Sequence, residues 1–427
     1  MRQSPTDAPQ SHVGSYYAAT VNDHTDFKPL RGEHNADVCV VGAGFTGIST
    51  ALHLAEKGYK VHVVEANKVG WGASGRNGGQ LIAGISAEKR LAKLMGDQAL
   101  WGLRWAGHEI IRQRVSTYNI DCDLKFGYID VAIKGRHLRD LESGCRYLEA
   151  NNFEHEYRLL SQVETRDLIG TDAYIGALLN MGNGHLHPLN LCIGEARAAV
   201  ANGATIYEQS PVTHIEHGAK AVVHTDAGSV KADFVVIAGN AYHRLERKLR
   251  GLVLPVNSFI IASEPLSAEL VQEINRDDVA VCDPNIILQY FRLSADKRLL
   301  FGGRCKYFGM DPEVIKSQLV PRMLKIYPQL RDTHFEFAWG GSIAVPVNRA
   351  PQFGRVASNV LYAQGYSGHG VNVTHVTGQI LAETIAGTSE RFDLISKLKT
   401  MRLPGAATFS RQLVSLGMIY YGLKDRL

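Results

Sequence analysis

Cysteine is scarce in this chain, and its few cysteines lie far apart. The six stand at positions 39, 122, 145, 192, 282 and 305, and no two are closer than 23 residues. That spacing excludes a CxxC redox motif and the close cysteine pairs of zinc sites. Scattered thiols in a chain of 427 residues are typical of a reducing compartment rather than of a secreted protein. We therefore expect a cytoplasmic protein without a bound metal.

Long apolar runs and runs of like charge are also missing. No segment approaches the ~18 consecutive apolar residues of a membrane-spanning helix. The polar N-terminal segment lacks the apolar stretch of a secretory signal. The 46 Lys and Arg residues exceed the 42 Asp and Glu residues only slightly, giving a net charge of +4. These features exclude a transmembrane segment and give no indication of a nucleic-acid partner.

Glycine, in contrast, is abundant. The 42 glycines exceed the usual share of ~7% in a chain whose 45% of hydrophobic residues is ordinary for a globular protein. At ~150 residues per domain, the length predicts two or three domains. Glycine allows the backbone to approach a ligand closely. The glycines cluster at 42–47, 70–79, 302–303, 340–341 and 365–370.

The first cluster lies between a predicted strand and a predicted helix. Residues 37–41 form an apolar run typical of a buried strand, and 46–57 have apolar residues at helical spacing. Residues 59–64 alternate as a second strand. The segment 42–47 between them has the spacing GxGxxG. This context is the one in which the motif binds a dinucleotide.

Each glycine of the motif has its own role. Gly42 allows the tight turn, Gly44 lets the backbone approach a pyrophosphate, and Gly47 lets the helix pack closely on the strand. The helix N-terminus offers N–H groups to the phosphates. Glu65 ends the second strand, where a carboxylate can accept both ribose hydroxyls and disfavours a 2′-phosphate. An ordinary glycine-rich turn is the alternative.

A second glycine-rich turn favours FAD over NAD. Residues 70–80 include five glycines and follow the acidic residue directly, where an NAD-binding fold would continue into a crossover helix. Ser74, Arg76 and many backbone N–H groups suit a second face of the pyrophosphate or the pyrimidine edge of a flavin. A flexible surface loop is the alternative.

A third turn completes the predicted site. The apolar strand 233–238 runs into Gly239, although a core strand that ends in a plain turn would have the same pattern. Residues 364–371 join a strand at 360–363 to a helix at 371–386. Glycines there let a flat ring lie on the backbone, and the positive helix end can stabilise negative charge on a reduced flavin.

The remaining pattern predicts further helices and a strand meander. The last helix has an apolar stripe that includes Phe409 and Leu416. We expect it to dock on its own domain, with a subunit contact in a homo-oligomer as the next option and a membrane-surface helix as the last. The meander spans 204–237, and the other predicted helices span 88–118, 137–150, 189–202, 312–327 and 406–421.

Together with further segments, these motifs resemble the D-amino-acid oxidase/glycine oxidase superfamily of FAD-dependent amine oxidoreductases. Within it, the chain is similar to the bacterial gamma-glutamylputrescine oxidases of polyamine breakdown, and the resemblance covers nearly the whole chain. The further segments are Ser15–Ala19, Ala51–Glu56, Ile120–Asp123, Gly184–Leu191, Ala238–Tyr242, Pro351–Arg355 and Tyr420–Leu427.

The resemblance implies an α/β fold with α+β insertions. A Rossmann-like FAD-binding domain would be assembled from three segments, and a substrate domain with an antiparallel sheet from the insertions between them. The implied parts are an N-terminal arm (1–34), the FAD-binding domain (35–95, 185–250 and 338–395), the substrate domain (96–184 and 251–337) and a C-terminal helix (396–427).

The resemblance also implies the cofactor contacts. Some relatives attach the flavin to a cysteine before the last strand, but residues 339–344 contain none, so we expect non-covalent FAD. The implied contacts are Gly42, Gly44, Phe45, Thr46, Gly47, Glu65, Ala66, Ala73, Ser74, Arg76, Asn77, Gly78, Gly79, Gln80, Val212, Ala238, Gly239, Gly365, Ser367, Gly368, His369, Gly370 and Val371.

The implied reaction oxidises an amine such as gamma-glutamylputrescine. Hydride passes to the flavin, the imine is hydrolysed to an aldehyde and ammonia, and O2 reoxidises the flavin to give H2O2. A partner-dependent or non-catalytic flavoprotein, or a dehydrogenase of another amine or amino acid, is the alternative. The catalytic candidates are Arg76, Asn77 and His369.

The substrate candidates are less specific. Arg292 or Arg304 could bind a substrate carboxylate, although surface ion pairing is the favoured alternative. The aromatic candidates could line the amine pocket, although packing in the core is favoured. His185 and His187 could reach the site or cap the helix that follows, and capping is the favoured interpretation. The aromatic candidates are Tyr290, Phe291 and Trp339, and Tyr307 is a further substrate candidate in the same predicted domain as Arg304.

Overall fold

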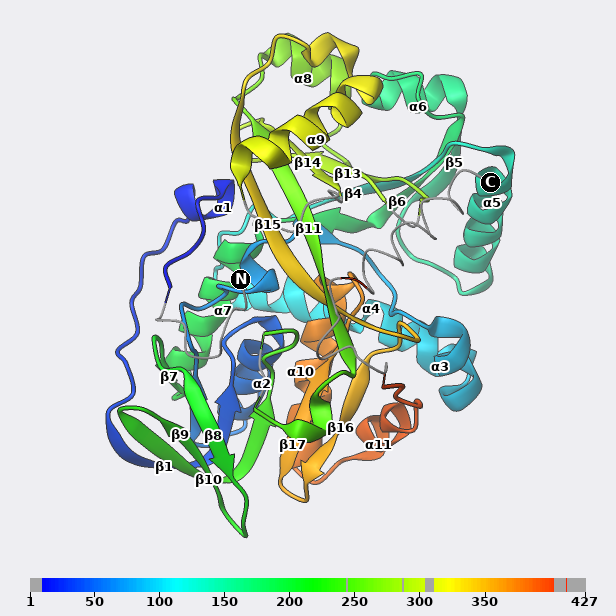
Figure 1. Cartoon of the computed structure of the whole chain (residues 1–427). Helices are drawn as coiled ribbons and strands as arrows, with labels where there is room; N and C mark the ends of the chain where they lie inside the picture. Colours follow the sequence, from blue (N-terminus) through cyan, green and yellow to red (C-terminus); the bar gives the residue numbers. More distant parts are fainter. Residues whose placement is uncertain (1–9, 243–244, 286–287, 304–310, 403–411, 413–427) are drawn as a thin grey trace.

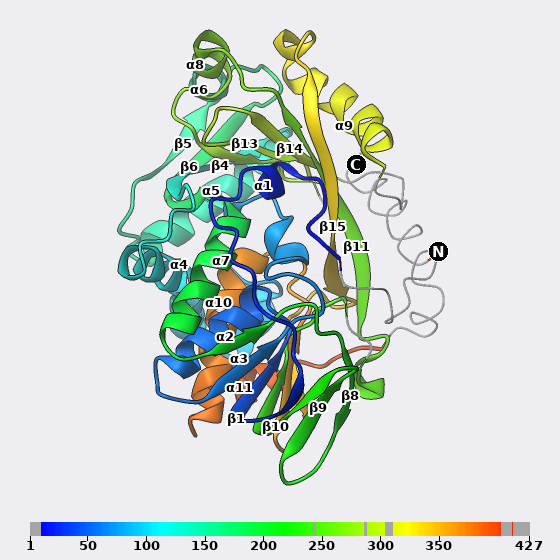
Figure 2. The same cartoon turned by 90° about the vertical axis from the view of Figure 1, so that its left-hand side faces the viewer.

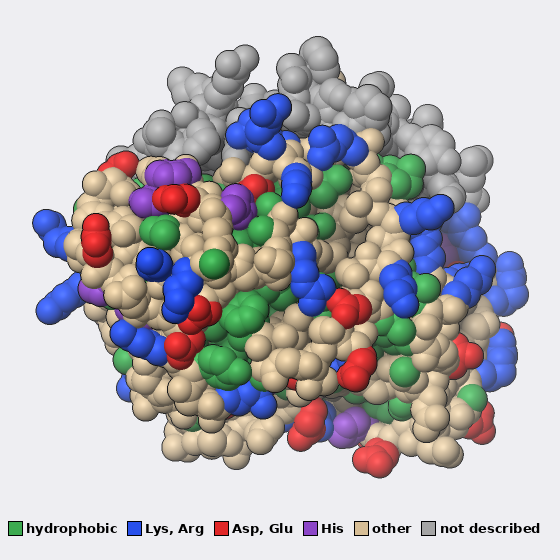
Figure 3. Space-filling model, turned by 90° about the horizontal axis from the view of Figure 1, so that it is seen from below, with side chains coloured by type: hydrophobic (Ala, Val, Ile, Leu, Met, Phe, Trp, Pro, Cys, Tyr) green, Lys and Arg blue, Asp and Glu red, His purple; other side chains and the backbone are tan. Residues whose placement is uncertain are grey.

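In a computed structural model of the chain, the described residues are 10–242, 245–285, 288–303, 311–402 and 412. The predicted C-terminal helix, Arg304 and Tyr307 therefore lie outside the described residues. None of the helices within those ranges has both the length and the apolar content needed to cross a membrane. On the face seen in Figure 3, acidic and basic side chains are interspersed.

The first of two sheets, sheet A, carries the GxGxxG turn. Its order is β16-β17-β10-β1-β2-β7, and the run from β17 to β7 is parallel. β16 pairs antiparallel with β17, and the β8–β9 meander pairs with β10. The strands occupy the lower part of Figure 1. Their bounds are β1 (Gly32–Val41), β2 (Val61–Val64), β7 (Thr205–Tyr207), β8 (Val212–Glu216), β9 (Ala221–Thr225), β10 (Gly228–Ile237), β16 (Gln352–Ala357) and β17 (Val360–Gln364).

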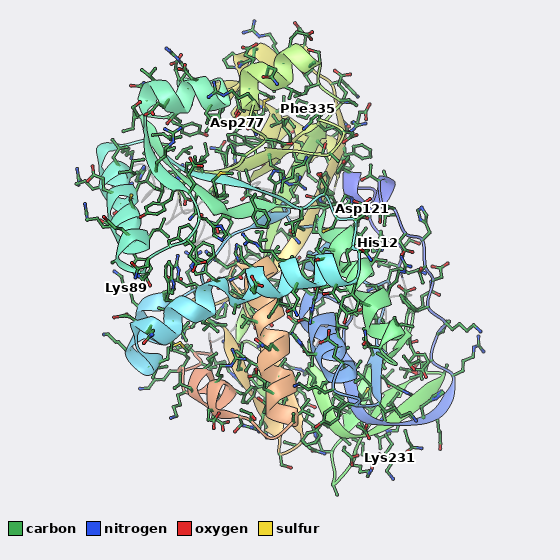
Figure 4. The ribbon with its side chains drawn as sticks, turned by 180° about the vertical axis from the view of Figure 1, so that it is seen from behind. His12, Lys89, Asp121, Lys231, Asp277 and Phe335 are labelled. Atoms are coloured by element: carbon green, nitrogen blue, oxygen red, sulfur yellow. The ribbon has the colours of Figure 1, made fainter. Side chains whose placement is uncertain are left out.

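Three helices cover one face of sheet A: α2 (Phe45–Ala55), α7 (Pro188–Ala201) and α10 (Gly370–Ile385). α2 lies between the other two. A Cβ on Gly378 of α10 would come within 2.4 Å of Ser49 Oγ in α2, so this glycine permits the close approach. A fourth helix, α4 (Asp97–Thr117), packs on α10 and crosses the molecule between Lys89 and Asp121 in Figure 4.

A buried ionic cluster joins these helices. Arg114 of α4 donates from Nη1 to Oε1 of Glu195 in α7 at 2.9 Å. His375 Nε2 of α10 lies 3.0 Å from the same oxygen. Glu195 and His375 have no exposed side-chain surface. Because the Glu195 carboxylate faces the Arg114 guanidinium and also contacts His375, its charge can exist away from water.

The second sheet, sheet B, forms the upper part of Figure 1. Its order is β15-β11-β14-β13-β12-β4-β6-β3, with β5 beside β6. The expected antiparallel sheet is confirmed, except that β12 and β4 pair in parallel. The bounds are β3 (Gln80–Leu81), β4 (Lys125–Ala132), β5 (Tyr157–Ser161), β6 (Gly176–His185), β11 (Val253–Ser263), β12 (Ala280–Cys282), β13 (Tyr290–Leu293), β14 (Leu299–Gly303) and β15 (Phe335–Pro346).

Side chains of sheet B alternate between two environments. Ile129 and Val131 of β4, like Phe291 of β13, belong to a core under the helices at the top of Figure 1. The intervening residues, such as Tyr128 and Asp130, point to the opposite face because strand side chains alternate. The helices on the core side are α6 (Gln162–Ile169), α8 (Ala268–Asn275) and α9 (Pro312–Ile326).

Two secondary-structure predictions need correction. The predicted helix at 88–118 is broken at Gly96, whose φ of +82° ends one helix with its N–H bonded to Ala92 O. The predicted irregular arm at 1–34 contains a short helix capped by the Ser15 side chain and the start of β1. Beyond that helix, the arm runs along the molecule to β1 (Figures 1 and 2). The remaining helices are α1 (Tyr16–Ala19), α3 (Glu88–Met95), α5 (Gly135–Ala150), α11 (Glu390–Ser396) and the 3-10 turns Ala73–Gly75, Arg247–Leu249 and Pro328–Leu330.

The predicted FAD-binding segments contain sheet A except for the first three residues of β1. They also contain β3 and most of β15, which pair in sheet B. The division into domains with the boundaries given above remains a proposal.

Candidate active site

A cavity of about 1780 Å³ lies between the carboxyl ends of the sheet A strands and the open face of sheet B. All three predicted glycine-rich turns line it. Twenty of the predicted cofactor residues are in its wall: Gly42, Gly44, Phe45, Thr46, Glu65, Ala66, Ala73, Ser74, Arg76, Asn77, Gly78, Gln80, Val212, Ala238, Gly239, Ser367, Gly368, His369, Gly370 and Val371.

Three predicted cofactor residues are not in the cavity wall: Gly47, Gly79 and Gly365. A Cβ on Gly79 would lie 2.2 Å from Leu186 O, and one on Gly365 would lie 2.5 Å from Pro346 Cγ. Gly79 and Gly365 have positive φ, and all three glycines contact protein rather than the cavity. Their lack of a side chain allows the turns to pack against the neighbouring chain.

The first turn leaves the N-terminus of α2 facing the cavity. Gly42 has a φ of +107°, which L side chains rarely adopt, and Gly44 supplies no side-chain cap. Ser74 Oγ of the second turn accepts a hydrogen bond from Phe45 N at 2.9 Å. The first turn of α2 has no acidic side chain, so its positive end suits an anionic group.

Glu65 is held at the end of β2 by backbone hydrogen bonds. Oε2 accepts from Ala43 N at 2.7 Å, and Oε1 accepts from Asn67 N at 2.9 Å. Burial raises the pKa of this carboxyl group above its usual value, against the opposite effect of these bonds. The carboxyl group lines the cavity one residue beyond the strand, where a ribose hydroxyl could donate to it.

Arg76 places a buried cation in the cavity wall. Its Nε donates to Trp71 O at 2.7 Å, and its guanidinium lies 4.1 Å from the centre of the Trp71 ring. Nη2 is buried, with no hydrogen-bond partner among the described residues. Burial lowers the pKa of Arg76. A cation with an unused donor fits a pyrophosphate or the polar edge of a flavin.

The side-chain amides of Asn77 and Gln80 stabilise the second turn through hydrogen bonds to backbone groups. Asn77 Nδ2 donates to Ser74 O at 2.8 Å, and Oδ1 accepts from Gly79 N at 2.8 Å. Gln80 Nε2 donates to Val281 O of sheet B at 2.9 Å. For Asn77, the contacts support a positioning role beside the cavity.

The third turn presents His369 and the N-terminus of α10 to the cavity. Gly368 has a φ of +99°, and His369 caps α10 without a side-chain hydrogen bond to the helix. Its Nδ1 lies 3.3 Å from Ser86 Oγ. The ring is exposed at the cavity, and partial desolvation, with the positive charges of Arg349 and Arg104, lowers its pKa.

The opposite wall comes from the open face of sheet B. Tyr290 covers Gly78 so closely that a Cβ there would lie 2.5 Å from the ring. Asp130 accepts a hydrogen bond from the Tyr128 hydroxyl at 3.0 Å, and Cys282 lines the cavity beside them. Burial raises the pKa of Asp130 to about 6. Of these sheet B residues, Tyr128, Asp130 and Cys282 were not predicted as site residues, whereas Tyr290 was. The alternation of Tyr128 and Asp130 with the apolar Ile129 and Val131 is the sequence signal that could have indicated those two.

Two substrate candidates are structural. Trp339 is 2% exposed, donates from Nε1 to Arg76 O at 3.0 Å and lies outside the cavity wall. Arg292 is also buried, and it donates to Gly78 O and Leu186 O at 2.9 and 2.8 Å. Core packing, the favoured alternative for Trp339, is what the structure shows. The prediction that Arg292 forms a surface ion pair was wrong, because the side chain is buried and its N–H groups donate to backbone carbonyls.

The two predicted histidines are likewise engaged in the fold. His187 Nδ1 accepts from Asn190 N at 3.1 Å and caps α7, as the favoured interpretation held. His185 is buried, with Nε2 2.8 Å from Asp278 O. Among the described residues, no group of three or more His, Cys, Asp or Glu side chains could hold a metal ion.

Comparisons with known proteins agree with this site. A family model described as FAD dependent oxidoreductase matches residues 37–384. Gamma-glutamylputrescine oxidoreductase of Escherichia coli (strain K12) is 42% identical, with 97% of this chain and 99% of that protein covered. The probable oxidoreductase OrdL of Haemophilus influenzae is 38% identical, with 98% of each covered.

A solved structure shows the same fold. Glycine oxidase from Geobacillus kaustophilus matches with a TM-score of 0.70 at 22% identity, covering 87% of this chain and 99% of that one. The buried cation of Arg76, the open end of α2 and the glycine turns fit the cofactor of the matched family. The chain therefore belongs to the family of FAD-dependent oxidoreductases, and FAD is its cofactor.

Proposed function

We propose that the protein oxidises a primary amine, and that the amine is gamma-glutamylputrescine or a related gamma-glutamyl polyamine. The observation that carries the proposal is the single cavity between the glycine-rich turns and a wall of side chains from sheet B. The relative with 42% identity, which is named for gamma-glutamylputrescine, supports the choice of substrate because the two chains match over almost their whole lengths.

Different residues of the site would bind different parts of the cofactor. The N-terminus of α2, with Gly42 and Gly44, would hold the pyrophosphate, and Glu65 would accept the ribose hydroxyls. Val212 would lie at the adenine and the α10 N-terminus at the flavin ring. Bound FAD supplies a two-electron acceptor for hydride from the carbon beside the amine nitrogen, and O2 then takes up both electrons as H2O2.

The chain's own residues would prepare the amine. Hydride leaves readily only when the nitrogen carries a free lone pair, so an incoming ammonium must lose a proton. His369 faces the cavity with a lowered pKa and can accept that proton as a neutral imidazole. Tyr290 closes the cavity wall over Gly78. Hydrolysis of the imine product gives an aldehyde and ammonia.

Anaerobic flavin reduction tests the proposal. The purified yellow protein would be mixed with putrescine, cadaverine, spermidine, their gamma-glutamyl forms, glycine and D-amino acids. We expect the gamma-glutamyl polyamines to bleach the flavin fastest, and air to restore the colour with one H2O2 per turnover. Bleaching by simple amino acids alone would reject the substrate class. Bleaching without recovery in air would indicate a dehydrogenase, and no bleaching a partner-dependent or non-catalytic flavoprotein.

A further inference from the structure

Asp130 is an acidic side chain in the cavity wall contributed by sheet B. It lies on β4 between Ile129 and Val131, which are both buried in the core on the other side of the sheet. Strand alternation therefore directs Asp130 into the cavity. A carboxylate that the surrounding protein screens from water, as it does that of Asp130, is costly unless a cation or hydrogen-bond donors accompany it.

The protein supplies only part of that compensation. The Tyr128 hydroxyl donates to Oδ1 of Asp130 at 3.0 Å. Among the described residues, Asp130 forms no ion pair with a Lys, Arg or His side chain. Arg104, the cation that acts on it from α4, is itself bound to Glu88. Asp130 can therefore receive a further positive group from the cavity.

The strand register sets how far this carboxylate lies from the flavin end of the cavity. Asp130 is opposite Cys282, and Cys282 is opposite Tyr290, which covers the Gly78 turn. At about 4.8 Å per strand, Asp130 lies two strands, or about 10 Å, from Tyr290. In gamma-glutamylputrescine, nine bonds join the oxidised carbon to the α-ammonium nitrogen. Three extended residues also contain nine backbone bonds and span about 10 Å.

We propose that Asp130 recognises a substrate ammonium group about 10 Å from the carbon that is oxidised. This inference rests on the proposed function and adds the residue that selects the substrate. The ammonium can come from the α-amino group of a gamma-glutamyl amide or from the far amine of a long polyamine. In putrescine, only four bonds separate the oxidised carbon from the other nitrogen, so its second amine is too near.

The test compares two amides of equal length in the FAD-loaded enzyme. Gamma-glutamylputrescine carries the α-ammonium, and glutarylputrescine has hydrogen in its place. The wild type should have a KM about 10- to 100-fold lower for the first, the range for a hydrogen bond between charged groups. In Asp130→Asn, that ratio should fall to near one with kcat unchanged, since a remote binding contact affects KM. Spermidine and putrescine in parallel distinguish the two sources of the ammonium.

The variant is designed to preserve the fold. The amide oxygen of the asparagine can still accept a hydrogen bond from the Tyr128 hydroxyl, so that buried donor keeps a partner. Asp226→Asn is the matched control, because Asp226 is exposed on the turn between β9 and β10. It changes the net charge equally and should leave both KM values unchanged.

A pH profile of the wild type is independent of any variant. Burial raises the pKa of Asp130 to about 6, against the Tyr128 hydrogen bond and the charge of Arg104. The Cys282 thiol also faces it, and burial raises the pKa of that thiol, so the thiol stays neutral in this range. The preference for gamma-glutamylputrescine should therefore weaken as the pH falls below about 6. Gamma-glutamylputrescine and glutarylputrescine carry the same reacting amine, so its titration affects both KM values equally and cancels in their ratio.

Several results would overturn the inference. It fails if the wild type does not distinguish the two amides, or if Asp130→Asn changes their KM values equally. A loss of kcat with both amides would instead indicate a role at the reacting carbon. If no amine reduces the wild-type flavin, the proposed function fails as well; if amines reduce it without discrimination, only the role of Asp130 is rejected.

Discussion

The carbonyl oxygen of Gly42 occupies the space that a side chain on Gly47 would need. A Cβ at Gly47 would lie 1.9 Å from this oxygen and 3.2 Å from Val40 Cγ1. Because the Gly42 carbonyl is part of the backbone of the cofactor turn on which α2 rests, it cannot move without displacing that turn. The last glycine of GxGxxG thus fixes the distance between helix and strand.

Gly47→Ala should therefore destabilise the fold by about 2 kcal/mol or more, as overpacking of a core does. It should also reduce FAD content, because the Gly42 turn must shift. The matched control is Gly102→Ala in α4, where a Cβ would meet nothing within 4 Å. That variant should stabilise the helix by about 0.5–1 kcal/mol. Chemical unfolding and the flavin-to-protein absorbance ratio measure both effects, and equal stabilities would contradict the prediction.

Arg76→Met should weaken FAD binding more than it destabilises the apoprotein. Nη2 of the side chain is buried without a partner among the described residues. Replacing the arginine therefore leaves no buried carboxylate without its counter-charge. We expect the Kd of FAD to rise about 10- to 100-fold. Titration of the apoprotein, followed by flavin fluorescence, measures this. Arg197→Met, at an exposed arginine paired with Asp23, should leave the Kd unchanged.

Glu195→Gln should destabilise the protein by about 3–5 kcal/mol, because it leaves the buried Arg114 guanidinium without a carboxylate. Glu313→Gln is the control; it breaks an ion pair with Lys316 at a side chain that is 79% exposed. No measurable loss is expected there. Similar losses in the free energy of unfolding for the two variants would reject the role of the cluster.

The same cluster predicts a loss of stability in acid. Burial favours the neutral form of Glu195, but the charges and hydrogen bonds of His375 and Arg114 hold its pKa at about 2, below the usual 4.5. A lowered folded-state pKa stabilises the protein above pH 4.5, and that contribution is lost as the pH falls toward 2. The slope of unfolding free energy in this window should be smaller in Glu195→Gln than in the wild type.

All of the flavin should leave the protein on mild acid precipitation. Residues 339–344 contain no cysteine, which is why we expect non-covalent FAD. The supernatant absorbance should account for the flavin of the native protein. Flavin retained in the pellet would contradict the prediction, and Cys282→Ser would then show whether the cavity thiol is the point of attachment.

The parts of the site made by local sequence could be predicted. GxGxxG between a strand and a helix specifies its own geometry, and the predicted strand 37–41 and helix 46–57 correspond to β1 and α2. The turn at 364–371 is similar, since its glycines precede a helix with regular apolar spacing. In both turns, the residues that form the sequence motif are also the residues that determine the local backbone structure.

The parts made by distant segments could not be predicted. Asp130, Cys282 and Tyr290 are neighbours only because β4, β12 and β13 pair, and the residue pattern within one strand does not show which distant strand it pairs with. Arg292 was misjudged for the same reason. Its partners, Gly78 O and Leu186 O, are more than a hundred residues away along the chain.

The separate origin of the two cavity walls has a practical consequence for protein engineering. One wall is formed by the glycine-rich turns, whereas the other presents side chains of sheet B such as Tyr128 and Asp130, between which Ile129 and Val131 point into the core. A designer who seeks activity on a new amine can therefore diversify positions such as Tyr128 and Asp130 while leaving the redox machinery intact. Acceptance of new compounds and retention of the flavin should then vary independently across such a library.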